Sequence, residues 1–177
     1  MIRPNLGVRS GRAVRAIILG LSALVFGCVT DGPIPRPAPR GPATQPVGIV
    51  PSIVDLAATR YARDSDKNGY ADEVEATAFL FAPPHDTPIT AAGEFHFSLV
   101  RLEGQPFATW AFTPEQSAAV IEKLLPGPGY RFRLGILDQA SDVFASEDMH
   151  LRCEFRPATG TPIQGRSPIR ITLGQLR

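Results

Sequence analysis

Cysteine is scarce in this chain, and its scarcity excludes one class of fold. The 177 residues include two cysteines, Cys28 and Cys153. Two cysteines cannot form the network of bridges that holds small secreted domains together. Stability must therefore come from a hydrophobic core, and the chain is long enough to build one ordinary domain around such a core.

The patterns of common catalytic sites are also missing. The sequence contains no glycine-rich phosphate loop, no G-x-S-x-G element and no zinc-ligand spacing. Its three histidines, His85, His96 and His150, fall on separate segments. Cys153 lies three residues beyond His150, so on a strand these two side chains point to opposite faces. We therefore expect no catalytic residues, and we expect Cys153 to be a buried core thiol.

An excess of positive charge is absent as well. The formal net charge is +1, but four arginines precede Cys28 in a segment that we expect to be removed. Without them, 18 − 4 = 14 Lys and Arg stand against 17 Asp and Glu, which gives a charge near −3. This balance predicts no binding to nucleic acid.

No long apolar run follows the N-terminus. Residues 1–27 consist of a basic region ending at Arg15 and an apolar run from Ala16 to Gly27. This run is shorter than the roughly 20 apolar residues that a membrane-spanning helix needs. The arrangement predicts a secretory signal peptide.

The end of this run, Val25-Phe26-Gly27-Cys28, resembles the lipobox of bacterial lipoproteins. Phe26 departs from the pattern, because that slot usually holds a small residue. The resemblance implies cleavage before Cys28, lipidation of its thiol with chains such as palmitate, and acylation of the new amine. Two or more chains give a stable membrane anchor, since each buried methylene contributes about 0.8 kcal/mol. Val29 follows in place of aspartate, which implies the outer membrane, with the domain facing the periplasm or the surface.

Two other interpretations of this N-terminus stay open, an ordinary cleavable signal or an uncleaved anchor that happens to end in cysteine.

The segment that follows, residues 28–51, is rich in proline. Seven prolines fall between residues 31 and 51, namely Pro33, Pro35, Pro37, Pro39, Pro42, Pro46 and Pro51. Such a segment favours polyproline II at about 3 Å per residue, so we predict a spacer between membrane and domain.

Residues 52–177 have the pattern of an all-β domain. Short apolar runs alternate at period two and are separated by Gly, Pro and Asp, which is typical of antiparallel strands. We expect strands over residues 74–81, 94–102, 107–112, 130–134, 149–155 and 170–173. They predict an antiparallel β-sandwich, transthyretin-like or immunoglobulin-like, in an order that the pattern does not give. Residues 52–63 fit either a helix or a strand.

One short helix is predicted between the strands. Thr113-Pro-Glu-Gln116 supplies an N-cap, a proline at the first helical position and a glutamine at the third, which together form a capping box. Val120 and Leu124, with Ile121 and Leu125 one step round, continue as an apolar stripe. We therefore expect the helix to run up to the Pro-Gly-Pro-Gly stretch that begins at residue 126.

The strongest motif is Asp64-Ser-Asp-Lys-Asn-Gly-Tyr-Ala-Asp-Glu-Val-Glu75, which matches D-x-[DN]-x-[DN]-G-x5-E at every specified position. It resembles the EF-hand calcium loop of sensor proteins and of bacterial dockerins. The resemblance implies one Ca²⁺ ion, with Gly69 making the sharp turn. The implied ligands are the side chains of Asp64, Asp66, Asn68, Asp72 and Glu75 and the backbone carbonyl of Tyr70.

The flanks of this loop differ from those of a paired EF-hand. Ala71 stands where a branched aliphatic residue usually joins two loops, and residues 74–81 have the pattern of a strand. We expect a calcium loop that joins two strands; an isolated EF-hand-like unit and a metal-free polar turn are the alternatives. Magnesium fits less well, because it takes few protein carboxylates.

A second acidic run contains Asp138, Asp142, Glu147 and Asp148. We interpret it as a solvated face, with a second cation site as the alternative.

Overall the sequence predicts a lipid-anchored cell-envelope protein with one structural calcium site, which acts as a binding or structural module. A calcium-responsive EF-hand regulator and an enzyme with a loop-built site are the alternatives. The sequence identifies no protein or carbohydrate partner.

Overall fold

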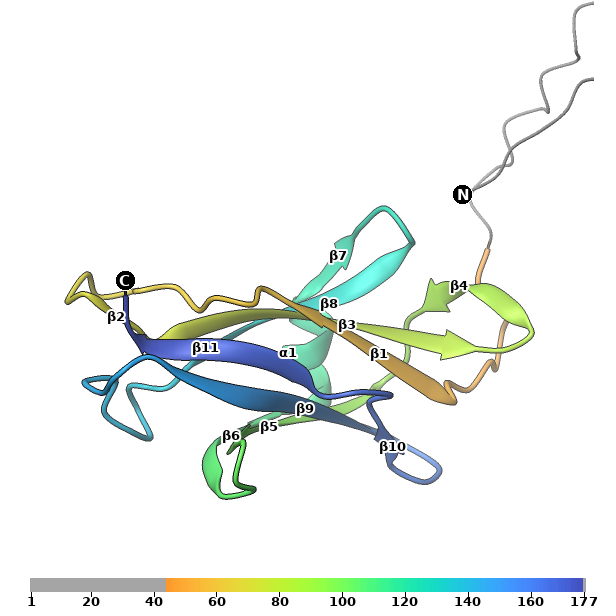
Figure 1. Cartoon of the computed structure of the whole chain (residues 1–177). Helices are drawn as coiled ribbons and strands as arrows, with labels where there is room; N and C mark the ends of the chain where they lie inside the picture. Colours follow the sequence, from red (N-terminus) through yellow and green to blue (C-terminus); the bar gives the residue numbers. More distant parts are fainter. Residues whose placement is uncertain (1–43, 177) are drawn as a thin grey trace, which may run out of the picture. The chain divides into compact units, whose positions relative to one another are not determined.

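The computed structural model describes residues 44–176, which form a β-sandwich (Figure 1). The predicted signal peptide, the lipidation site Cys28 and most of the predicted linker lie outside the described residues. Within the described part, no helix is long and apolar enough to cross a membrane.

Two antiparallel sheets make up the sandwich. The first has the order β1-β3-β8-β7, with β4 also paired to β3. Its strands are β1 (Ile53–Ala58), β3 (Glu73–Ala82), β4 (His85–Ile89), β7 (Ile121–Lys123) and β8 (Pro128–Gly135). The second has the order β2-β11-β9-β5-β6, with β10 also paired to β9. Its strands are β2 (Tyr70–Ala71), β5 (Gly93–Arg101), β6 (Pro106–Phe112), β9 (Glu147–Pro157), β10 (Ile163–Gln164) and β11 (Ile169–Gln175). The prediction of an all-β sandwich is confirmed.

The core is built by the period-two alternation of these strands. On β5, Phe95 is fully buried and its ring centroid lies 4.8 Å from that of Tyr130, 5.1 Å from Phe132 and 4.7 Å from Phe155. Such tilted aromatic contacts add stability beyond the burial of apolar area. Cys153 is also buried, as expected, and burial raises the pKa of its thiol to about 12. The thiol is therefore protonated and unreactive at neutral pH.

The helix is shorter than the sequence predicts. Thr113 forms the expected capping box with Gln116, but α1 (Pro114–Ala119) ends before the predicted apolar stripe. Val120 is the C-cap, and Ile121 begins β7, which pairs with β8 as a hairpin. The backbone N–H of Leu124 donates to the carbonyl of Gly127 over 3.0 Å and closes the hairpin turn. β-branched residues favour this extended pairing over a helix, so the predicted helix over residues 120–125 is wrong.

The ambiguous segment 52–63 contains a strand, not a helix. β1 pairs with β3 from Ile53–Phe81 to Ala58–Ala76. Strands therefore flank residues 59–72, which we call the acidic loop, on both sides. Contacts with the domain also begin earlier than the predicted boundary at residue 52. The side-chain amide of Gln45 donates to the Thr90 carbonyl over 2.8 Å and accepts from the Thr90 N–H over 2.8 Å.

The central position of Phe95 predicts a large effect of truncation. We expect Phe95→Ala to lower the free energy of unfolding by about 3–5 kcal/mol, because the cavity lies among three other aromatic rings. Leu125→Ala is the matched control, since Leu125 is fully exposed, and should change stability by less than about 0.5 kcal/mol. Urea unfolding measures both values, and equal effects would contradict this description of the core.

Candidate metal centre

The acidic loop connects β1 to β3 and is closed at its base by backbone hydrogen bonds. The N–H of Arg63 donates to the Glu73 carbonyl over 2.7 Å, and the N–H of Asp72 donates to the Arg63 carbonyl over 2.8 Å. Two residues of the loop form β2, whose partner is the end of β11. These contacts hold the loop at one end of the sandwich, beside the C-terminal strand (Figure 1).

Asp64 shapes the turn of the loop. Its Oδ1 accepts from the N–H of Lys67 over 2.6 Å and that of Asn68 over 3.2 Å, and its Oδ2 accepts from Gly69 over 2.8 Å. Desolvation raises the pKa of this carboxyl, but the three backbone N–H groups together lower it below the ordinary value. Gly69 has a φ of 91°, which a glycine adopts without strain.

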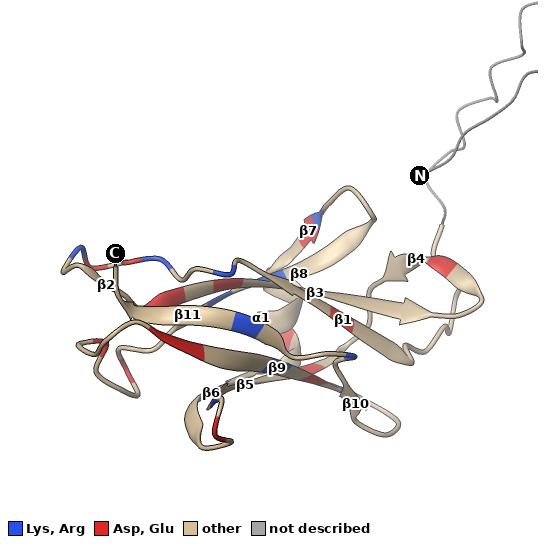
Figure 2. Ribbon diagram, in the orientation of Figure 1, with Lys and Arg blue, Asp and Glu red and all other residues tan. Residues whose placement is uncertain are grey.

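Three aspartates meet at the centre of the site. One carboxylate oxygen from each of Asp66, Asp72 and Asp142 lies within 4.8 Å of the others, and we call these residues the carboxylate cluster. Asp72 is fully buried and Asp142 is 4% exposed. Asp142 comes from the segment between β8 and β9, and Figure 2 shows acidic residues in both loops at this end of the sandwich.

Neutral groups supply the hydrogen bonds of these carboxylates, and no buried side-chain oxygen within the described residues lacks a partner. The side-chain amide of Asn68 donates to Asp66 Oδ2 over 3.1 Å and to Asp142 Oδ2 over 2.8 Å. The N–H and hydroxyl of Ser65 each donate to Asp72 over 2.7 Å. Within residues 44–176, none of the three carboxylates is in an ion pair with Lys, Arg or His. The cluster thus collects three carboxylates, and no positive side chain of the described residues pairs with any of them.

This arrangement opposes ionisation of Asp66. Desolvation is the largest cause that raises the pKa of Asp66, and the carboxylates of Asp64, Asp142 and Asp72 raise it further. The N–H of Asn68 acts in the opposite direction but does not reverse the shift. Carboxylates held this close repel one another unless a proton or a cation intervenes.

β11 joins the two halves of the cluster. At its end, the N–H of Gln175 donates to the Phe144 carbonyl over 2.9 Å, and the N–H of Leu176 donates to the Gly69 carbonyl over 3.0 Å. Phe144 lies two residues beyond Asp142, and Gly69 lies within the acidic loop. The C-terminal strand therefore fixes the distance between the loop and the segment that carries Asp142.

Most of the sequence-predicted ligands lie in or around the cluster. Asp66, Asn68 and Asp72 are together, and Asp64 turns its carboxylate to the loop backbone. Tyr70 begins β2, and its N–H donates to Asn68 Oδ1 over 2.8 Å.

Glu75 differs from the expectation. It lies on β3, with Oε1 3.5 Å from Nε of Arg131, and does not belong to the cluster. The chain becomes extended directly after Asp72, which carries Glu75 away at about 3.3 Å per residue.

Asp142 takes the place in the cluster that the motif gives to Glu75. In the sequence, Asp142 belongs to the acidic run from Asp138 to Asp148, whose pattern predicts a solvated face. That interpretation is wrong for Asp142, which is buried. Residues so distant along the chain are brought together by the pairing of β11 with β2 and β9, which the sequence pattern does not give.

The donor set fits a hard divalent cation. It contains three carboxylates, and no thiol or imidazole; the amide NH2 of Asn68 faces these carboxylates as a donor, while its oxygen accepts from the Tyr70 N–H. Oxygen donors of this kind suit Ca²⁺ or Mg²⁺, and the number of protein carboxylates favours Ca²⁺. Comparison with protein family models and with curated proteins gives no match.

A shallow hollow on the outer face of the second sheet contains His96, one of the residues considered for catalysis. Its Nε2 lies 3.0 Å from Glu94 Oε2. The neighbouring Glu154 accepts from Arg156 over 2.5 Å, and this bond is the largest cause that lowers the pKa of Glu154. These charges form surface ion pairs along the sheet, an arrangement that occurs without catalysis.

The raised pKa of Asp66 predicts a pH dependence for the metal-free protein. The folded state holds this proton more tightly than the unfolded chain, so Asp66 makes the protein less stable as the pH rises above about 3.8, the ordinary value. We therefore expect Asp66→Asn to gain stability relative to wild type as the pH rises from there towards neutrality. Urea unfolding at a series of pH values measures the difference.

Asp142→Asn provides the control for this prediction, because it removes one of the charges that repel Asp66. In that background the gain from Asp66→Asn should shrink, as expected for interacting groups. A difference between wild type and Asp66→Asn that stays constant with pH would contradict the raised pKa.

Proposed function

We propose that this chain is a lipid-anchored protein of the cell envelope, whose β-sandwich domain holds one structural Ca²⁺ ion and acts as a binding or structural module. The observation that supports the calcium proposal is the carboxylate cluster, whose three carboxylates lie within 4.8 Å of one another and have no ion-pair partner among the described residues. Asp66, Asp72 and Asp142 would supply charged ligands and Tyr70 its backbone carbonyl. Asn68 would have to turn its amide by half a rotation to bring to the ion the oxygen that here accepts from the Tyr70 N–H. Asp64 would keep the loop in shape.

The ion would replace repulsion by attraction between separate parts of the fold. It would connect the loop between β1 and β3 to the segment between β8 and β9, which no covalent link joins closely. A ligand that binds only the folded state stabilises it by RT ln(1 + [Ca²⁺]/Kd), which is about 1.4 kcal/mol at a tenfold excess over Kd. Extracellular modules have a Kd of about 10⁻⁴–10⁻³ M, so that effect would need about 1 mM calcium at the lower Kd and about 10 mM at the higher one.

The flanks of the loop favour a structural ion over a regulatory one. EF-hand sensors respond to calcium by opening a pair of helices that flank the loop. Here strands β1 and β3 flank the loop, and both lie within a hydrogen-bonded sheet. We therefore place the calcium-responsive regulator second.

The location in the cell envelope rests on sequence features alone. The lipobox-like residues that end in Cys28 would supply the anchor, and the proline-rich segment would supply the spacer. Two or more acyl chains suffice for stable membrane attachment.

Calcium should stabilise the protein through the carboxylate cluster and not through Glu75. We expect calcium to raise the melting temperature relative to chelator, and Asp142→Asn to weaken calcium binding at least tenfold by calorimetric titration. Glu75→Gln is the matched control, because the motif assigns it a ligand role while the structure places it beside Arg131. A loss of binding in Glu75→Gln with none in Asp142→Asn would contradict the proposed ligand set.

The anchor should depend on one of the two cysteines. Cys28→Ala should abolish the incorporation of labelled palmitate and release the protein from the membrane fraction, because no acyl chain can then attach. Cys153→Ala is the control, since Cys153 is a buried thiol in the core, and it should leave both labelling and membrane attachment unchanged. Labelling that persists in Cys28→Ala would exclude the lipoprotein assignment.

A further inference from the structure

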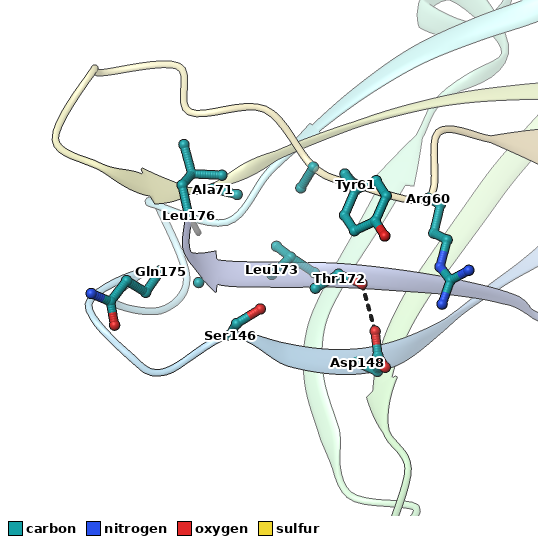
Figure 3. Close-up of a pocket in the computed structure, with 11 residues that line it drawn as sticks. Arg60, Tyr61, Ala71, Ser146, Asp148, Thr172, Leu173, Gln175 and Leu176 are labelled. Atoms are coloured by element: carbon teal, nitrogen blue, oxygen red, sulfur yellow. Dashed lines mark hydrogen bonds between the residues drawn. The ribbon is translucent and has the colours of Figure 1, made fainter.

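Figure 3 shows a pocket of about 450 Å³. Ala71, which precedes Asp72 in the chain, lines it, but no residue of the carboxylate cluster does. Its walls are residues 60–62 of the acidic loop, the start of β9 and the end of β11. The segment 60–62 is held against β11, because the N–H of Ala62 donates to the Thr172 carbonyl over 3.1 Å and the N–H of Thr172 donates to the Arg60 carbonyl over 2.7 Å. Pockets of this volume hold small ligands.

The pocket combines an apolar floor with an exposed aromatic ring. Ala62, Ala71 and Leu173 line its floor but are almost fully buried, so the accessible apolar surface comes mainly from Tyr61 and Leu176. Tyr61 leaves 68% of its surface exposed although it is a large aromatic residue. A ring of this kind can pack flat against an apolar ligand face while its hydroxyl stays in water.

Polar side chains surround this surface. Thr172 donates to Asp148 over 2.5 Å, and this is the one hydrogen bond that Figure 3 marks between the lining residues drawn. Arg60, Ser146 and Gln175 also line the pocket. Together they present the guanidinium of Arg60 as a donor, the carboxylate of Asp148 as an acceptor, and a hydroxyl and an amide that can be both.

The charges of the pocket do not select an ionic ligand. Hydrogen bonds from Thr172 and Arg170 lower the pKa of Asp148, and Arg170, which does not line the pocket, is paired with this carboxylate. Arg60 and Asp148 contribute one charge of each sign to the lining, so the lining itself has no net charge that would attract an anion or a cation. A neutral ligand with several hydroxyl groups can use both residues as hydrogen-bond partners.

From these features we propose that the pocket binds a neutral saccharide unit. A pyranose ring has an apolar face of C–H groups, which would pack against Tyr61, and an edge of hydroxyl groups. Those hydroxyls would donate to Asp148 and accept from Arg60, with Ser146 and Gln175 completing the contacts. This inference goes beyond the proposed function and does not depend on calcium, because the pocket and the carboxylate cluster share no residue.

The test is binding of neutral trisaccharides to the full chain, kept in a detergent without a sugar head group. Maltotriose, cellotriose and N,N′,N″-triacetylchitotriose are the neutral probes, and trigalacturonic acid is the anionic comparison. Calorimetry gives the affinity, and saturation-transfer NMR shows which sugar protons contact an aromatic ring. We expect at least one neutral trisaccharide to bind, and to bind more tightly than trigalacturonic acid.

Variants locate the binding. Tyr61→Ala and Arg60→Ala should each weaken it about five- to tenfold, while Tyr61→Phe keeps the ring and most of the affinity. Arg152→Ala is the matched control, since Arg152 is an exposed arginine on β9 outside this pocket, and should bind like wild type. Unchanged melting temperatures would show that the variants remain folded.

The proposal would be overturned if no neutral probe binds at about 10 mM, a concentration that detects even millimolar affinities. It would also be overturned if the anionic trisaccharide binds more tightly than the neutral ones. A third contrary result would be binding that Tyr61→Ala and Arg60→Ala both leave unchanged. Each titration is repeated with calcium and with chelator. Loss of calcium binding alone would overturn the proposed metal site and leave the saccharide pocket intact.

Discussion

Repulsion among three carboxylates at one end of the sandwich is the constraint on which this part of the structure depends. Asp72 and Asp142 are buried, and Asp66 lies beside them. Burying a charge is costly unless an opposite charge or several hydrogen bonds compensate it. Ser65 and Asn68 supply hydrogen bonds, but no basic side chain of the described residues pairs with these carboxylates. The missing opposite charge is the physical reason to propose a divalent cation at this position.

The rest of the sandwich supplies the stability that lets such a site exist. Phe95 and its aromatic neighbours join the two sheets, and β3 contributes small residues, Ala76 and Ala78, at the interface. β1 and β3 are paired over six residues, so the ends of the acidic loop are fixed. A rigid frame keeps like charges close together where a flexible chain would let them separate.

The fold was largely predictable from the sequence, because period-two alternation directly reflects burial on one face of a strand. Phe95, Phe97 and Leu99 are buried as the pattern indicates. The helix was half predictable: its capping box is a local signal, whereas its end depends on the pairing of β7 with β8. The acidic loop was recognisable because its motif is also a local signal. Which carboxylates form the cluster was not predictable from that motif. Asp142 and not Glu75 lies beside Asp66 and Asp72, because strand pairing, which is non-local, decides which carboxylates meet.

The position of β11 in the chain has a consequence for the order in which the domain matures. The acidic loop is synthesised early, but it meets Asp142 only after the segment between β8 and β9 exists, and both are held in place by the backbone of Gln175 and Leu176. A growing polypeptide would carry the intact twelve-residue motif for most of its synthesis without possessing the site. A chain that ends before β11 would retain every residue of the acidic loop. It would lack the backbone hydrogen bonds that hold this loop next to the segment that carries Asp142.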